Sequence, residues 1–258
     1  MPSSPTNDRT RQIVVTASEV FCLVGTLVGV GVLGTSVEDT ADGALAADAT
    51  LLAPAGTAFS IWSVIYIGLF AYTIWQWLPS QTTREVHRRI GYLAAVSMIL
   101  NASWLLVTQQ GWIWVSVLVI LALAVNLGLL LRKMTVRPSR ELTDKIIIDA
   151  TFGLYLGWVA VASVANITTA LIVSGLDPHP FLANIFAVAV LIVVVGLGVL
   201  FNERLGGRWA VAAAMAWGLG WISVGRLTDE PHSIVTGLAA ALAALAILGL
   251  TWQARRSR

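Results

Sequence analysis

The sequence predicts an all-α polytopic membrane protein with eight transmembrane helices. Of its 258 residues, 57% are hydrophobic and only 12% are charged, whereas soluble domains carry about 25% charged residues. The apolar residues also gather in eight stretches, each close to the ~20 residues that a helix needs to cross the hydrocarbon layer of a membrane. The connections between these stretches are too short to hold a soluble domain.

The limits of the spans follow from the apolar stretches. We expect helices at residues 13–35, 59–78, 91–109, 112–131, 146–174, 181–201, 209–226 and 233–252. Because the ends of predicted elements are the least certain part of such an assignment, each limit carries an error of several residues.

The basic residues predict the orientation of the spans. Every Lys and Arg except Arg226 lies in the two tails or in the connections on one side, while acidic residues such as Glu38 and Asp229 lie on the other side. Cytoplasmic loops carry the excess of Lys and Arg in membrane proteins. We therefore predict a plasma-membrane protein whose N- and C-termini are both cytoplasmic.

Several function classes are excluded by residues that the spans lack. Both lysines lie in one predicted loop, so no lysine is available for a retinal Schiff base, and the single Cys excludes a disulfide framework. His87 falls in a basic loop, and His179 and His232 flank the outer ends of spans, so we expect interfacial side chains rather than axial ligands of a haem. There is no basic run interleaved with aromatic residues that would bind nucleic acid. No metal site or acid–base pair favours an enzyme, and no cofactor is required.

Ionisable residues at membrane depth are functional candidates, because burying them is costly. Glu19, Asp149 and Arg226 meet this description. For Glu19 the sequence leaves open a structural partner or a role in ligand or proton handling. We expect Asp149 to pair with Lys145 at the i,i+4 spacing of a helix, and Arg226 to extend its side chain to the outer surface beside Asp229.

Aromatic and amide residues recur at helical spacing on three spans. Phe59, Trp62 and Tyr66 fall at offsets 0, 3 and 7, which is one face of a helix. Inward-facing rings and amides suit a flat apolar ligand that is held by stacking and a few hydrogen bonds. The candidate ligand-binding residues are Phe59, Trp62, Tyr66, Asn101, Trp104, Trp158, Ala162 and Asn166.

A second interpretation of these residues is structural. Trp and Tyr collect at membrane interfaces as anchors, and Asn often ties transmembrane helices together. Six further tryptophans lie near span ends, where we expect interfacial anchors: Trp75, Trp77, Trp112, Trp114, Trp209 and Trp252.

Three motifs resemble a known family. Pro-x-Gly followed by Phe-x-x-Trp-x-x-x-Tyr at residues 54–66, Leu-Asn-x-x-Trp at 100–104, and Tyr-x-x-Trp-Val at 155–159 followed by Asn166 are similar to the signatures of the tryptophan-rich sensory protein / translocator protein family, also called the peripheral benzodiazepine receptor family. The resemblance departs from the family pattern at Ala55 and Thr57, at Ser60-Ile61 and at Ser97.

The resemblance implies a five-helix translocator-protein-like bundle over residues 13–176, capped by the loop between its first two helices. Residues 1–12 are then a cytoplasmic tail, and residues 177–258 form an extension of three additional transmembrane helices with a basic tail. Family members bind porphyrins and other flat hydrophobic molecules. The extension is expected either to pack beside the bundle or to replace a contact between two chains.

The resemblance and the aromatic stripes together predict a function. We expect a protein that binds a flat hydrophobic ligand, such as a porphyrin or another tetrapyrrole, and acts as a sensor, carrier or regulator. Its expected partners are the lipid bilayer and this ligand, with a homodimer left open. The alternative is a secondary transporter for a small solute, although every proline lies outside the spans and no internal repeat is evident.

Overall fold

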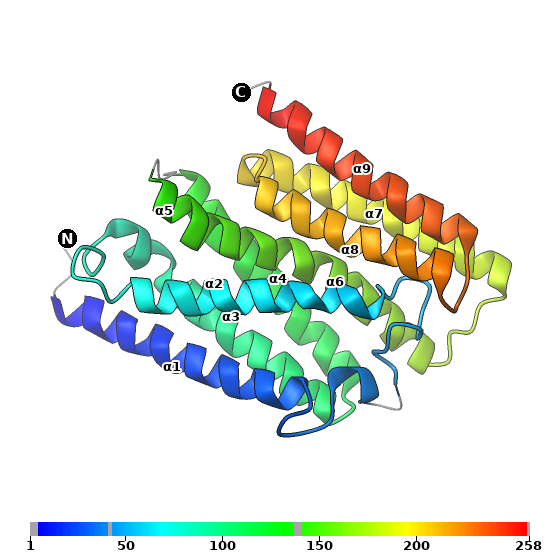
Figure 1. Ribbon diagram of the computed structural model, residues 1–258, viewed down its shortest axis with the longest axis horizontal. Coiled ribbons are helices and arrows are strands. Elements are labelled where there is room, and N and C mark those ends of the chain that lie inside the picture. The colour runs from blue at the N-terminus through cyan, green and yellow to red at the C-terminus, as the bar shows by residue number, and fades with distance from the viewer. Residues whose placement is uncertain (1–4, 41–42, 137–140, 257–258) are drawn as a thin grey trace.

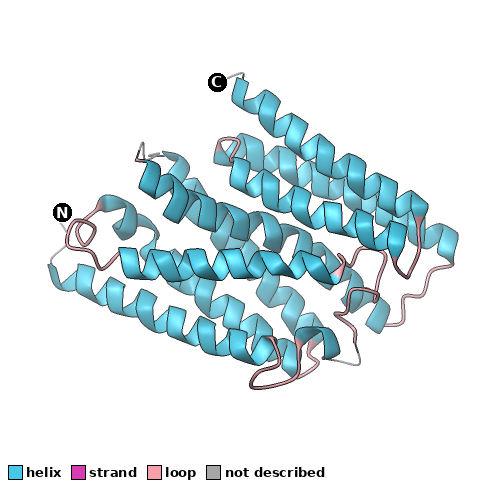
Figure 2. Ribbon diagram, viewed as in Figure 1, coloured by secondary structure: helices cyan, strands magenta, loops and turns pink. Residues whose placement is uncertain are grey.

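The computed structural model describes residues 5–40, 43–136 and 141–256. Within these ranges the secondary structure is helical, without a strand (Figure 2). Eight helical segments of the described chain are long and apolar enough to cross a membrane. The predicted fold class, an all-α polytopic membrane protein, is confirmed.

Nine α-helices follow one another along the described chain. They are α1 (Pro5–Gly29), α2 (Ile61–Trp75), α3 (Glu85–Gln109), α4 (Ile113–Val136), α5 (Leu142–Asp144), α6 (Thr151–Val173), α7 (Pro180–Leu205), α8 (Trp209–Thr228) and α9 (Ile234–Arg256). A 3-10 helix, Gly56–Ser60, leads into α2. A π-helical segment, Lys145–Ala150, joins α5 to α6, so that the fifth span runs over Leu142–Val173.

The first helix differs most from its prediction. It begins at Pro5 rather than at residue 13, and it ends at Gly29 rather than at residue 35. The early start is favoured by Asp8 in the first turn, because an acidic group stabilises the N-terminus of a helix. The chain then turns back at Gly31, whose φ of +81° suits glycine.

Helices α1, α2, α3, α4 and α6 form a five-helix unit. Helix α3 packs between α1 and α4, α4 packs against α6, and α2 lies more loosely against α6 and α1 (Figure 1). Helices α7, α8 and α9 lie beside this unit, with α8 against α6 and α9 between α8 and α7.

Small residues bring α6 and α8 into close contact. A Cβ atom added to Gly157 would lie 2.3 Å from the carbonyl oxygen of Val211, and one added to Gly218 would lie 2.9 Å from Cγ1 of Val161. Transmembrane helices commonly approach each other through such small residues. The three-helix extension is thereby fixed along the length of α6.

The two ends of the bundle differ in charge and connections. Helix α1 begins and α9 ends at the same end, at the left of Figure 1, as an even number of spans requires. We call it the basic end: it carries the α2–α3 connection, α5 and the α7–α8 turn. The opposite, acidic end carries the capping loop, which we define as residues 30–60, described at 30–40 and 43–60.

Candidate functional site

Aromatic rings from two spans meet inside the five-helix unit. The ring of Trp62 stacks on that of Tyr66 with centroids 5.3 Å apart, and it meets the rings of Trp158 and Tyr155 edge-on at 6.2 Å and 5.7 Å. Phe59 also contacts Trp158 edge-on, with ring centroids 5.6 Å apart. Tyr155 and Trp158 are buried, whereas Phe59, Trp62 and Tyr66 are half-buried.

A cavity of about 380 Å³ opens beside the aromatic cluster at the acidic end. We call it the aromatic cavity. Its volume lies within the range of about 300–1,000 Å³ that is typical of small-molecule sites. It is lined by Thr26, Gly29, Val30, Ser36, Val37, Glu38, Phe59, Trp62, Ser63, Tyr66, Trp104 and Leu105.

The predicted site residues divide between this cavity and a smaller one. Phe59, Trp62, Tyr66 and Trp104 line the aromatic cavity. A neighbouring space of about 40 Å³, with Phe59 and Trp104 in both linings, is bordered by Trp158, Ala162 and Asn166. Asn101 lines neither cavity. The structure therefore brings seven of the eight predicted residues to one region.

The two asparagines make contacts between helices. Asn101 donates hydrogen bonds to the hydroxyl of Tyr66 at 3.0 Å and to the sulfur of Cys22 at 3.4 Å. The amide oxygen of Asn166 accepts a hydrogen bond from Nε1 of Trp104 at 2.9 Å, and its nitrogen donates one to Ser116 at 3.0 Å. These bonds hold Tyr66 and Trp104 in place, so the amides orient the rings of the site.

Three features of the cavities were not anticipated from the sequence. Glu38 of the capping loop is the charged residue among those that line the aromatic cavity, and Thr26 and Ser63 add hydroxyl groups to it. The indole nitrogen of Trp158 is buried and has no hydrogen-bond partner in the described chain. Because Trp Nε1 is a donor, a molecule beside Trp158 would meet an unused N–H group.

The capping loop is held in place by Arg226 of α8. The guanidinium donates hydrogen bonds to the carbonyl oxygens of Thr50 at 2.9 Å, Ala47 at 3.0 Å, Pro231 at 3.2 Å and Glu230 at 3.3 Å. Arg226 is 1% exposed. The prediction that its side chain reaches the outer surface is therefore wrong, because the loop supplies carbonyl acceptors inside the protein.

Two tryptophans of α8 hold the same loop nearer to α2. Nε1 of Trp217 donates a hydrogen bond to the carbonyl oxygen of Ala58 at 2.9 Å, and the carbonyl oxygen of Trp221 accepts one from the amide of Ala55 at 3.2 Å. The extension therefore positions the loop that covers the aromatic cluster, a role that its Ala- and Gly-rich sequence gave no sign of.

At the basic end two expected interfacial residues are buried. His87 is fully enclosed, with its ring centroid 5.3 Å from that of Trp75 and 5.7 Å from that of Tyr72. Its Nε2 lies 3.4 Å from Oε1 of Gln81. Trp75 is also buried, because the α2–α3 connection folds over this end of the bundle. The prediction of an interfacial side chain is therefore wrong for both His87 and Trp75.

Asp149 pairs with a different partner from the predicted one. Its carboxylate forms an ion pair with Arg208, which lies before α8, rather than with Lys145. The reason is tertiary packing: α8 contacts the π-helical segment Lys145–Ala150 and brings Arg208 to Asp149, whereas Lys145 is exposed.

Glu19 lies buried in α1 with no hydrogen-bond partner for either carboxylate oxygen within the described ranges. Only 2% of the residue is exposed. A structural partner, one of the two roles left open for Glu19, is absent from its surroundings there.

These features define a class of protein: an all-α membrane protein with an aromatic-lined cavity beside a loop that is fixed to an added group of helices. A protein-family model described as TSPO-like protein matches residues 13–252. The chain therefore belongs to the TSPO-like protein family, and the match includes α7, α8 and most of α9. No curated protein and no solved structure matches the chain.

Proposed function

We propose that this protein binds a flat hydrophobic ligand, a porphyrin or a related tetrapyrrole, in the aromatic cavity, and that it acts as a sensor, carrier or regulator. The observation that carries the proposal is the position of Trp62, which borders the cavity while contacting the rings of Tyr66, Tyr155 and Trp158. A planar ring system placed there would extend an existing stack, which is a favourable geometry for aromatic groups.

The chemistry of the lining agrees with binding by stacking. The cavity lining holds no histidine among the described residues, and histidine is the usual axial ligand of haem iron in binding proteins. The free N–H of Trp158, which borders the smaller neighbouring space, favours a ligand that extends there with an acceptor at its edge. The carboxylate of Glu38 would repel a carboxylate of the ligand that lay against the same wall.

Fluorescence quenching tests this proposal. Added protoporphyrin is expected to quench the tryptophan fluorescence of the purified protein. Trp62→Ala combined with Trp158→Ala should weaken binding about 5- to 150-fold, since each lost aromatic contact is worth about 0.5–1.5 kcal/mol. Trp112→Ala, at an exposed position outside the cluster, is the matched control. Equal affinity in the double variant and the control would reject this site.

The charge of Glu38 can be tested in the same titration by comparing ligands with and without carboxylates. The dimethyl ester of protoporphyrin lacks both carboxylates, so it should bind at least as tightly as the free acid to the unchanged protein. Glu38→Gln should reduce any difference in affinity between the free acid and the ester. A free acid that binds more tightly than the ester, with no response to Glu38→Gln, would place the ligand away from this wall.

Glu19 favours a second candidate, the carrier of a solute whose passage is coupled to protons. A buried carboxylate without a partner in the described chain is typical of ion pathways in membrane proteins. Protoporphyrin uptake into proteoliposomes under a pH gradient tests this role. A carrier predicts uptake that Glu19→Gln abolishes while binding persists; binding without uptake favours a sensor or regulator.

The basic end gives the proposed orientation. We propose that it faces the cytoplasm, with both termini, in a plasma membrane, because positively charged connections are retained on that side. Labelling of single cysteines introduced at each end of the bundle in intact cells tests the orientation. Chemical cross-linking in the membrane tests whether two chains associate as a homodimer.

A further inference from the structure

A second cavity of about 380 Å³ lies at the basic end, between the five-helix unit and the extension. We call it the charged cavity. Residues from α3, α4, α5, the π-helical segment, α8 and α9 contribute to it, together with the α7–α8 turn. Its lining includes the charged side chains of Asp144, Lys145, Asp149, Arg208 and Arg255, and the indole of Trp209.

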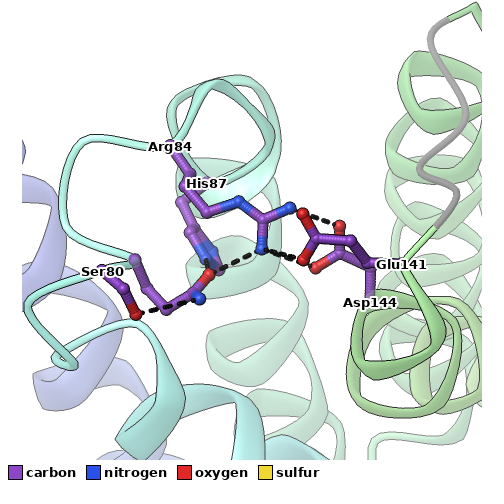
Figure 3. Close-up of polar contacts among 6 residues, drawn as sticks. Ser80, Arg84, His87, Glu141 and Asp144 are labelled. Atoms are coloured by element: carbon purple, nitrogen blue, oxygen red, sulfur yellow. Dashed lines mark hydrogen bonds and ion pairs between the residues drawn. The ribbon is translucent and has the colours of Figure 1, made fainter.

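One of the two acidic residues in this lining is already neutralised. Arg84 donates hydrogen bonds to both carboxylate oxygens of Asp144, at 3.0 Å and 2.7 Å, and it also contacts Glu141 at 3.1 Å. Figure 3 shows the Arg84 guanidinium directed at both carboxylates from the α2–α3 side. Such a bidentate pair satisfies the carboxylate, so Asp144 contributes little free negative charge to the cavity.

The lining holds three cations, Arg208, Arg255 and Lys145, and one remaining carboxylate, that of Asp149. Arg208 pairs with it through Nη1 and donates from Nη2 to Thr135 at 3.1 Å, while its Nε–H is buried without an acceptor in the described part of the chain. Arg255 donates from Nη1 to the carbonyl oxygen of Gly207 at 3.1 Å. Lys145 is exposed and forms no ion pair with the residues described.

The charge of Arg208 persists under ordinary conditions. Burial lowers the pKa of Arg208 to about 10, which is still well above neutral pH. The guanidinium therefore stays cationic in the cavity wall, and the wall carries more positive than negative groups. A buried cation with an unused donor is unfavourable unless a further acceptor satisfies it.

We propose that the charged cavity binds a phosphate group, supplied either by the headgroup of an anionic phospholipid or by a soluble phosphate. Phosphate offers several strong acceptor oxygens and pairs well with arginine, so one group can accept from Arg208, Lys145 and Arg255 together. No residue of this cavity takes part in the aromatic cavity, so the two sites are separate.

The position of the charged cavity fits this ligand chemistry. Basic pockets between transmembrane helices at the membrane boundary bind phospholipid headgroups. Trp209, 42% exposed in the lining, has the amphipathic side chain that is typical of that boundary. The lining also includes part of a π-helical segment, a local structure that is frequent at functional sites.

Lipid binding to the detergent-solubilised protein tests the proposal. Native mass spectrometry is used to compare phosphatidylglycerol with phosphatidylcholine, and inorganic phosphate is added as a competitor. We expect preference for phosphatidylglycerol and a loss of about tenfold in its affinity for Lys145→Gln and Arg208→Gln, since each removes a charge-assisted hydrogen bond. Arg132→Gln, an exposed cation outside the cavity, is the control and should bind as the unchanged protein does.

The competitor distinguishes the two sources of the phosphate. Displacement of the lipid by millimolar phosphate supports a soluble ligand, and binding that resists it supports a headgroup. Absence of binding by both phosphatidylglycerol and inorganic phosphate, or equal losses in Lys145→Gln and Arg132→Gln, would overturn the proposal. Lys145→Gln keeps the test valid if Arg208→Gln fails to fold, because Lys145 is exposed and its removal breaks no ion pair among the described residues.

Discussion

The two ends of this protein hold cavities of the same volume, about 380 Å³, but of opposite chemistry. The aromatic cavity is walled by indole and phenol rings and one carboxylate, whereas the charged cavity is walled by three cations and two carboxylates. The aromatic cavity lies within the five-helix unit under its capping loop. The charged cavity exists only because α8 and α9 pack beside that unit.

The comparison shows that the extension contributes to both ends. Helix α8 holds the capping loop through Arg226, Trp217 and Trp221 at the acidic end. At the basic end, its first residues and the preceding Arg208 form one wall of the charged cavity. Changes that loosen α8 should therefore affect both cavities, and changes in the side chains of one lining should affect only that cavity.

The largest expected effect is that of Arg226→Ala. It leaves four loop and turn carbonyls without their donor, and unsatisfied buried groups cost about 1–3 kcal/mol each. We expect the free energy of unfolding to fall by about 3 kcal/mol or more and amide hydrogen exchange in residues 43–58 to accelerate. Arg204→Ala, at an exposed position, should change the free energy by less than about 0.5 kcal/mol. Slow exchange in the Arg226 variant would show that the loop is held by other contacts.

Gly157→Ala tests the contact between α6 and α8. The new Cβ atom would meet the carbonyl oxygen of Val211 at 2.3 Å, so the helices must separate, and overpacking of this kind costs about 1–3 kcal/mol. Thermal unfolding should detect the loss, and ligand binding at both ends should weaken. The matched variant Gly196→Ala, with open space around the new atom, should be neutral or stabilising by up to about 1 kcal/mol. Equal stability of the two variants would contradict the close approach.

Asn166→Leu is expected to act on the aromatic cavity alone. It leaves Nε1 of Trp104 without its acceptor, at a cost of about 1–3 kcal/mol for a buried donor. The combination with Trp104→Phe, which removes that donor, should cost less than the sum of the two single changes. A double-mutant cycle of unfolding free energies measures this coupling. Additive changes would mean that the bond between Trp104 and Asn166 contributes nothing.

The sequence predicted the fold class and brought attention to four residues that line the aromatic cavity, Phe59, Trp62, Tyr66 and Trp104, because both depend on local patterns. Eight apolar stretches define the spans, and the 0, 3, 7 spacing places Phe59, Trp62 and Tyr66 on one helical face. It did not predict the partners of Arg226 and Asp149. Arg226 contacts Thr50, which is 176 residues away along the chain. Asp149 of the five-helix unit contacts Arg208, which precedes α8 of the extension. Such pairs depend on tertiary packing, which spacing along the chain does not encode.

A crossed titration tests the separation of the two cavities most directly. Protoporphyrin and phosphatidylglycerol are each titrated against the unchanged protein, Trp62→Ala and Lys145→Gln. We predict that Trp62→Ala weakens only the binding of protoporphyrin and that Lys145→Gln weakens only the binding of the lipid. The assignment of opposite chemistry to the two ends is contradicted if either substitution weakens the binding of both ligands equally. It is also contradicted if Trp62→Ala leaves protoporphyrin binding unchanged and Lys145→Gln leaves lipid binding unchanged.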